Sequence, residues 1–209
     1  MSTTCLKCGG TGKLVNGEIC PDCSKELGIA VPILYGVPVQ YQGVSFDKSF
    51  LPEKEQKGYG EFMEELLTTI VNDYAYYQKN LLICNRPNSG KTVWAYNLYA
   101  ILSSKGYEIP PLKDISEVRD IITSYTDKEL ANLYSTARCA IIKVPRDLQP
   151  WMFDSMSMII ERRVRNDGFT IFLFGGTEED LRYADRYGRI KDITGTGAYN
   201  TVKLCTFNK

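Results

Sequence analysis

The fold is decided by the stretch Leu81-Leu82-Ile83-Cys84-Asn85-Arg86-Pro87-Asn88-Ser89-Gly90-Lys91-Thr92. Its first four residues are apolar and predict a buried strand, and the apolar residues after Thr92 recur at the spacing of a helix. A strand, a tight loop and a helix start form the layout of a phosphate-binding P-loop, whose pattern is Gly, four free residues and Gly-Lys-Ser/Thr. Asn85 replaces the first Gly, and Asn tolerates a positive φ better than other residues except Gly.

The candidate nucleotide-binding residues are the eight residues of this loop: Asn85, Arg86, Pro87, Asn88, Ser89, Gly90, Lys91 and Thr92. Backbone N–H groups of such a loop converge on phosphates, the lysine adds a positive charge, and the hydroxyl of Thr92 can bind Mg²⁺. The loop therefore predicts ATP or ADP as a ligand, with Mg²⁺. A Ser/Gly turn leading into an ordinary helix, with a solvated Lys91, is the alternative interpretation.

Composition limits the classes of function. The chain has 209 residues, 44% of them hydrophobic, with 25 basic and 25 acidic residues and a formal net charge of zero. Strong nonspecific attraction to nucleic acid or to an anionic membrane is therefore not expected, although a local basic patch stays possible in principle. The sequence has neither a membrane-spanning apolar run nor a signal peptide pattern, so we expect a cytoplasmic protein without a membrane partner.

Four of the seven cysteines form a cluster near the N-terminus: Cys5, Cys8, Cys20 and Cys23. Two Cys-x-x-Cys pairs, with glycines after the first pair, suit tetrahedral zinc because each pair presents two thiolates to one ion. The chain contains no His, so this cluster can offer only a site of four thiolates. We predict a structural zinc site, and a redox pair or a disulfide is the alternative.

Apolar segments alternate between strand and helix patterns along most of the chain, which predicts an α/β fold with a parallel sheet covered by helices. The expected organisation is a zinc-binding module at 1–30, a Pro-rich connector at 31–60 and a nucleotide-binding domain at 61–209. The predicted strands are 81–84, 139–144, 169–174 and 201–207, with a short one within 106–112. The predicted helices are 61–77, 115–124, 128–135 and 152–164, with a further helix capped by Thr177.

The segment Val37–Phe46, which reads Val-Pro-Val-Gln-Tyr-Gln-Gly-Val-Ser-Phe, resembles the "Ile-Pro-x-x-Tyr … Phe" lead-in of DnaC/DnaI-type replicative helicase loaders. These bacterial and phage proteins are AAA+ ATPases, and the resemblance covers about 37–209 through the order and spacing of the P-loop and later segments. It implies an AAA+-like domain, a hexameric replicative helicase as partner, possible contact with single-stranded DNA, and possible self-association. DnaI-type members also carry an N-terminal zinc-binding domain. We expect the protein to be encoded by a phage and to act in the host cytoplasm.

This chain departs from the family pattern at the catalytic positions. The family usually places two acidic residues where this chain has Lys143 and Val144, and a polar sensor where it has Gly175-Gly176-Thr177. The expected arginine finger falls near Ile193, with Arg186 or Arg189 as conceivable substitutes. The resemblance therefore implies a nucleotide-binding protein with weak or absent ATP hydrolysis.

Two acidic residues stay as weak catalytic candidates. Asp147 and Asp154 follow the strand that ends at Val144, although a loop acid and a helix cap are the plainer interpretation. Two other functions compete with a loader. The first is an active P-loop ATPase or kinase that uses unrecognised carboxylates. The second is a non-catalytic adaptor or inhibitor that mimics a host loader.

The basic run Glu161-Arg162-Arg163-Val164-Arg165 also has two interpretations. It can contact single-stranded DNA or a neighbouring subunit. The second interpretation, which we favour, is that these side chains form a solvated helix face.

Overall fold

The computed structural model describes residues 37–41, 44–124, 127–185, 188–189 and 202–207. A parallel five-stranded sheet has the order β2-β3-β4-β1-β5, so β4 lies between the P-loop strand β1 and β3. The strands are β1 (Asn80–Cys84), β2 (Lys113–Asp114), β3 (Cys139–Val144), β4 (Phe169–Phe174) and β5 (Val202–Thr206). The predicted parallel α/β sheet is confirmed.

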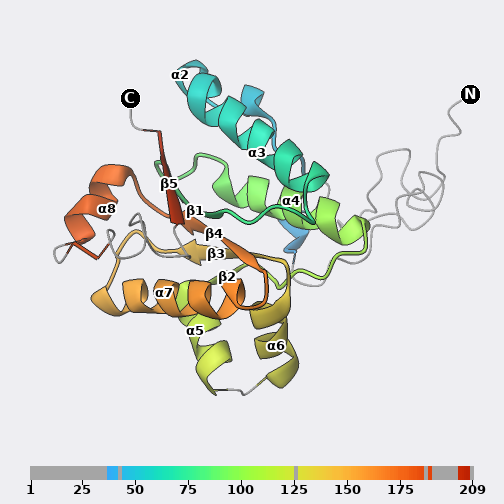
Figure 1. The fold of residues 1–209 in the computed structure, drawn as a ribbon. Helices are drawn as coiled ribbons and strands as arrows, with labels where there is room; N and C mark the ends of the chain where they lie inside the picture. The colour runs from blue at the N-terminus through green and yellow to red at the C-terminus, as the bar shows by residue number, and fades with distance from the viewer. Residues whose placement is uncertain (1–36, 42–43, 125–126, 186–187, 190–201, 208–209) are drawn as a thin grey trace, which may run out of the picture.

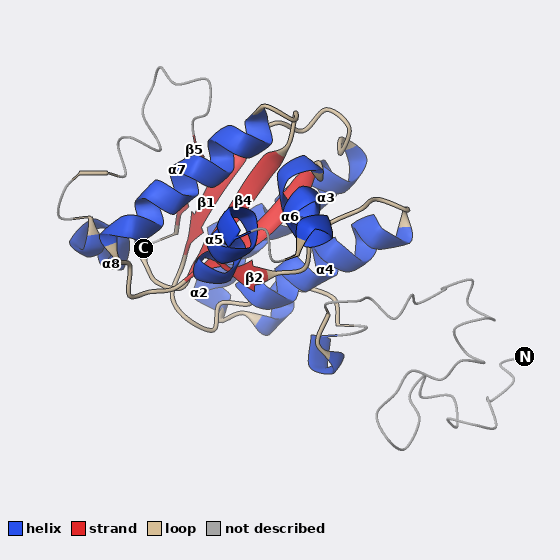
Figure 2. Ribbon diagram, turned by 90° about the horizontal axis from the view of Figure 1, so that it is seen from below, coloured by secondary structure: helices blue, strands red, loops and turns tan. Residues whose placement is uncertain are grey.

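Helices cover both faces of the sheet (Figures 1 and 2). On one face lie α3 (Glu61–Asn72) and α4 (Lys91–Ser104). On the other face lie α5 (Ile115–Ser124), α6 (Lys128–Thr136) and α7 (Pro150–Val164). A further helix, α8 (Glu178–Ala184), follows β4. None of the described helices combines the length and hydrophobicity that a transmembrane span requires.

Burial explains why the central strands read as continuous apolar runs. All residues of β1 and β4 are buried, because helices shield both faces of a parallel sheet. One apolar cluster joins the sheet to α3 and α4, and a second joins it to α5, α7 and α8. Trp94 of α4 is fully buried, and its indole N–H donates to the carbonyl oxygen of Met63 at 2.7 Å, which fixes α4 to α3.

The predicted element boundaries differ from the structure in a few places. The helix predicted at 61–77 ends at Asn72, and the expected strand within 106–112 is replaced by the two-residue β2, which starts at Lys113. Two prolines at 110 and 111 explain this difference, because proline cannot donate a hydrogen bond within a sheet. The Thr177 cap is present: its hydroxyl accepts from the N–H of Asp180, whose carboxylate accepts from the N–H of Thr177.

The segment before α3 packs against the P-loop. It contains three short turns, η1 (Val39–Tyr41), η2 (Lys48–Phe50) and η3 (Gln56–Gly60), and the single helical turn α2 (Glu53–Glu55). Backbone angles inside η3 are not helical, and Gly58 has φ 80° and ψ −80°. This glycine therefore allows the sharp change of direction between α2 and α3.

Arg163 of α7 is an exception to the interpretation of the basic run as a solvated face, whereas Glu161 and Arg165 in that run are exposed. The Arg163 side chain is fully buried, and its guanidinium donates to Thr170 Oγ1 and to the carbonyl oxygens of Tyr134, Ala137 and Phe169. Burial lowers its pKa to about 10. This arginine joins the ends of α6, α7 and β4, and it is not available to DNA.

Candidate nucleotide-binding site

The P-loop occupies the turn between β1, which ends at Cys84, and α4, which begins at Lys91. In the sheet, Cys84 lies opposite Phe174 of β4 and Thr206 of β5, and Val144 of β3 also lies opposite Phe174. Four strands therefore end at the same level. Because parallel strands share one carboxyl edge, the loops that follow them converge beside the P-loop.

Two loop residues have the left-handed backbone, Asn88 with φ 60° and Gly90 with φ 79°. A Cβ atom at Gly90 would also lie 3.1 Å from the ring of Phe46, so this position needs glycine for two reasons. Asn85 does not have a positive φ, so tolerance of that conformation does not explain why Asn replaces the first Gly of the pattern, and this prediction is wrong. Its side-chain oxygen accepts from the N–H of Arg86 at 2.8 Å, so Asn85 braces the loop with a hydrogen bond.

Lys91 points back into the loop. Its ammonium group donates to the carbonyl oxygens of Asn85 at 2.7 Å and Arg86 at 2.9 Å, and to Ser89 Oγ at 3.0 Å. The residue is 8% exposed, and burial lowers its pKa to about 8. The loop thus holds a desolvated cation at the start of α4, where backbone N–H groups are unpaired, and this combination suits an anion such as a phosphate.

A cavity of about 830 Å³ adjoins the loop. Its walls come from the P-loop, the segment before α3, the turn after β4 and the end of β5, with Asn85, Arg86, Glu55, Thr177 and Phe207 among them. The volume lies in the range of pockets that bind small molecules. A nucleotide whose phosphates lie at the P-loop can therefore place the rest of its atoms here.

An ion pair forms part of the wall of this cavity. The Arg86 guanidinium donates through Nε to a carboxylate oxygen of Glu55, and this contact raises the pKa of Arg86. The Glu55 side chain is only 12% exposed. Sequence reasoning did not single out Glu55, because it lies 31 residues before Arg86 and belongs to no motif. No sequence signal could have identified it.

The carboxyl end of β3 carries no acidic residue. Residues alternate between the faces of a strand, so Lys143 shares a face with Cys139 and Ile141, which belong to the cluster packed with α3 and α4. The buried Val144 belongs to the opposite cluster. Lys143 is half-buried. The hydrogen bond from Lys113 lowers the pKa of Glu117, a residue of α5, and the charge of Lys143 adds a smaller effect in the same direction. The end of β3 thus carries a lysine and a buried valine in place of the two acidic residues of the family pattern.

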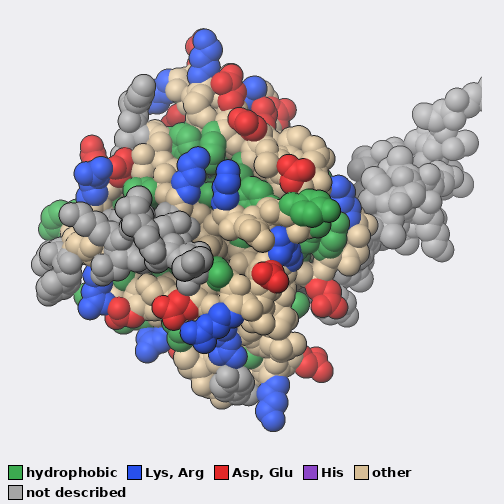
Figure 3. All heavy atoms as spheres, viewed as in Figure 1, with side chains coloured by type: hydrophobic (Ala, Val, Ile, Leu, Met, Phe, Trp, Pro, Cys, Tyr) green, Lys and Arg blue, Asp and Glu red, His purple; other side chains and the backbone are tan. Residues whose placement is uncertain are grey.

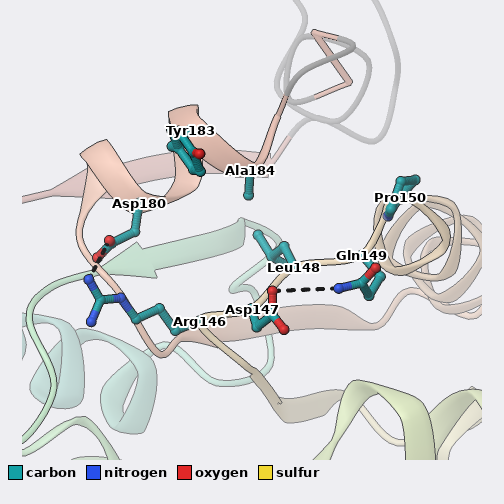
Figure 4. A pocket seen from close by; sticks show the side chains of 8 residues that line it. All are labelled: Arg146, Asp147, Leu148, Gln149, Pro150, Asp180, Tyr183 and Ala184. Atoms are coloured by element: carbon teal, nitrogen blue, oxygen red, sulfur yellow. Dashed lines mark hydrogen bonds and ion pairs between the residues drawn. The ribbon is translucent and has the colours of Figure 1, made fainter.

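The two weak catalytic candidates lie elsewhere. Asp147 lines a second cavity, of about 560 Å³, where it accepts from Gln149 Nε2 at 3.5 Å (Figure 4). In the same cavity Arg146 pairs with Asp180 at 2.7 Å. Asp154 is paired with Arg189. Neither aspartate lines the cavity beside the P-loop, so the structure does not bring them to the predicted phosphate site.

Several predicted site residues lie outside the described residues: Cys5, Cys8, Cys20, Cys23, Arg186 and Ile193. Within the described ranges, no group of three Cys, Asp or Glu side chains is arranged to hold a metal ion. On the face of the molecule seen in Figure 3, Lys and Arg side chains are interspersed with Asp and Glu side chains. This mixture agrees with the zero net charge of the sequence.

Comparison with known proteins gives structural matches alone. No family model and no curated protein matches the sequence. A putative primosome component from Streptococcus pyogenes serotype M3 superposes with a TM-score of 0.56 at 14% identity, over 82% of this chain and 90% of that chain. DnaI superposes with a TM-score of 0.54 at 16% identity, over 82% and 93%. The DnaC helicase loader superposes with a TM-score of 0.56 at 16% identity, over 81% and 99%.

This chain has the fold of the DnaC helicase loader. The matches cover nearly the whole length of those structures, and they agree with the helicase-loader fold that the resemblance implied. At 14–16% identity they establish the fold and leave the activity to be argued from the site.

Proposed function

We propose that this chain is a helicase-loader-like DNA replication protein. It binds ATP through Asn85–Thr92 and a replicative helicase through its N-terminal region, and it hydrolyses ATP weakly or not at all. The observation that carries the proposal is the pairing of a formed P-loop with a β3 strand that ends in Lys143 and Val144. Similarity of fold to DnaI and to the DnaC helicase loader supports the replication role.

Nucleotide binding and hydrolysis make different demands on the site. Binding needs backbone donors and a cation, which Gly90 and Lys91 supply, while Thr92 offers a hydroxyl for Mg²⁺. Hydrolysis also needs a positioned water and neutralisation of the charge that develops on the phosphate. Lys143 at the strand end supplies neither a base nor a metal ligand, so the site favours retention of the nucleotide over turnover.

The first experiment separates binding from hydrolysis. A fluorescent ATP analogue with Mg²⁺ should bind to the wild-type protein and not to Lys91→Met, while phosphate release should be the same for both proteins. A single change, Lys143→Asp, should raise phosphate release without improving affinity. Rapid release by the wild type that disappears in Lys91→Met would show an active ATPase instead.

The second experiment tests the partner. The full-length protein should elute together with a hexameric replicative helicase from the same source in size-exclusion chromatography. Removal of residues 1–30 should abolish the complex while ATP binding persists. A complex that survives this deletion would place the helicase contact elsewhere.

A further inference from the structure

Unpartnered polar atoms gather in the cavity beside the P-loop. Among the described residues, the buried side-chain atoms that lack a hydrogen-bond partner are Glu55 Oε2, Tyr59 OH, Tyr74 OH and Asn85 Nδ2. The residues of three of these atoms, all except Tyr74, line this one cavity. Buried polar groups in native proteins are nearly always paired, so this concentration indicates that a ligand group completes the site.

The chemistry of the three atoms is set by their neighbours. The guanidinium of Arg86 donates to Oε1 of Glu55, which leaves Oε2 free. The backbone N–H of Arg86 donates to Asn85 Oδ1, so the side-chain nitrogen Nδ2 of Asn85 is the free donor. The Tyr59 hydroxyl lies beside the side chains of Ser89 and Asn85 without a regular hydrogen bond. Tyr59 is 2% exposed and Asn85 is 4% exposed, so bulk water does not satisfy them.

This arrangement favours an uncharged ligand that offers both a donor and an acceptor. Glu55 Oε2 can only accept a hydrogen bond, and Asn85 Nδ2 can only donate one. A phosphate oxygen has no proton for the carboxylate, and a metal ion accepts nothing from the amide. A hydroxyl, or an amine beside a ring nitrogen, satisfies both atoms.

We propose that Glu55, Tyr59 and Asn85 recognise the nucleoside part of the bound nucleotide, through a ribose hydroxyl or through the amine edge of the base. This inference rests on the proposed binding of phosphates at Asn85–Thr92, since the nucleoside then extends into the cavity that Asn85 and Arg86 line. Phe207 lines the same cavity and packs edge-on against Tyr59, with 5.0 Å between ring centroids. It adds an apolar wall of the kind against which nucleosides pack.

Nucleotide analogues test the proposal. Binding of ATP is compared with binding of 2′-deoxy-ATP, 3′-deoxy-ATP and purine riboside triphosphate, which lacks the base amine. The wild-type protein should bind at least one analogue about tenfold more weakly than ATP, and the analogue affected identifies ribose or base as the source of the contact. Glu55→Gln and Tyr59→Phe should bind ATP more weakly and lose much of this discrimination.

Two controls separate recognition from structural damage. Glu53→Gln changes an exposed carboxylate of the same helical turn and should keep the wild-type discrimination. Tyr59→Phe removes a buried hydroxyl that has no partner, so the nucleotide-free variant should unfold at the same or higher denaturant concentration than the wild type. Weaker ATP binding in a protein of undiminished stability assigns Tyr59 to the ligand.

Two results would overturn the inference. One is equal affinity of the wild-type protein for ATP and for all three analogues. The other is unchanged discrimination in both Glu55→Gln and Tyr59→Phe. Absence of any ATP binding by the wild-type protein is a different result, because it removes the proposed function on which the inference rests.

Discussion

We expect Lys91 to make the proposed nucleotide affinity depend on pH in a range where few other side chains titrate. Its ammonium group lies among three oxygen atoms of the P-loop, yet burial lowers its pKa from 10.5 to about 8. A phosphate is attracted to the charged form of this lysine. Nucleotide binding should therefore raise the pKa of Lys91 and take up a proton whenever the free protein has lost it.

The magnitude follows from the titration of a single group. With a pKa of about 8, Lys91 is about nine-tenths charged at pH 7 and about one-tenth charged at pH 9. Affinity for ATP should therefore fall about tenfold between these two pH values, with uptake of about one proton per nucleotide bound at pH 9. A lysine with an ordinary pKa would stay charged over this range and would give no such change.

Titration calorimetry measures both quantities. Runs at about pH 9 in two buffers of different ionisation enthalpy give the number of protons taken up, and the same titrations at about pH 7 should show almost none. Constant affinity and no proton uptake at about pH 9 would refute the reasoning, provided that Lys91→Met still abolishes binding. That variant shows that the lysine, and not another group of the loop, carries the effect.

The same pKa change predicts how Lys91 affects stability. The unfolded chain keeps the proton up to the ordinary pKa of 10.5, whereas the folded nucleotide-free protein releases it near 8. The unfolded state thus binds more protons between these values, so the contribution of Lys91 to the free energy of unfolding rises with pH across this window. Denaturation curves should show the wild type gaining stability relative to Lys91→Met as the pH increases from about 8 to about 10.5.

Three further predictions concern other parts of the chain. Arg163→Ala should lower the free energy of unfolding by about 3 kcal/mol or more in a denaturant titration, because it leaves three carbonyl oxygens without a partner, and a loss below about 1 kcal/mol would contradict this role. Trp94→Phe should cost about 1–3 kcal/mol by removing the buried hydrogen bond to Met63 and part of a fully buried ring, which the same titration measures, with Trp151→Phe as a partly exposed control. Metal analysis of the reduced protein should find about one zinc ion per chain and much less in Cys8→Ser, and an equal content in both proteins would argue against the four-cysteine site.

Hydrophobic patterning predicted the sheet well because its strands are buried on both faces. The strands at 139–144 and 169–174 have the predicted boundaries, since continuous apolar runs ended by Pro145 and Gly175 leave little freedom. The P-loop was predictable for a different reason. Its pattern places a glycine at a fixed position between a strand and a helix, and Gly90 has the positive φ that such a tight loop uses.

Contacts between distant segments were not predictable. Arg163 lies in a run of charged residues that reads as a solvated face, and only the packing of α6, α7 and β4 shows that carbonyl oxygens surround it. The role of Glu55 was unpredictable for the same reason, because its ion-pair partner Arg86 lies in a distant segment of the chain. Local sequence determines periodicity and turn chemistry, whereas the burial of a charge depends on how the elements pack.

The packing of residues 46–60 on the P-loop affects how the protein can be divided for experiments. Phe46 and Leu51 lie against Gly90, and Glu55 holds Arg86, so a recombinant fragment that starts at residue 61 would lose contacts to the loop itself. Such a fragment should have an altered phosphate site even where its sheet folds correctly. A fragment that starts near residue 37 keeps these contacts and is the better choice for crystallisation with a nucleotide.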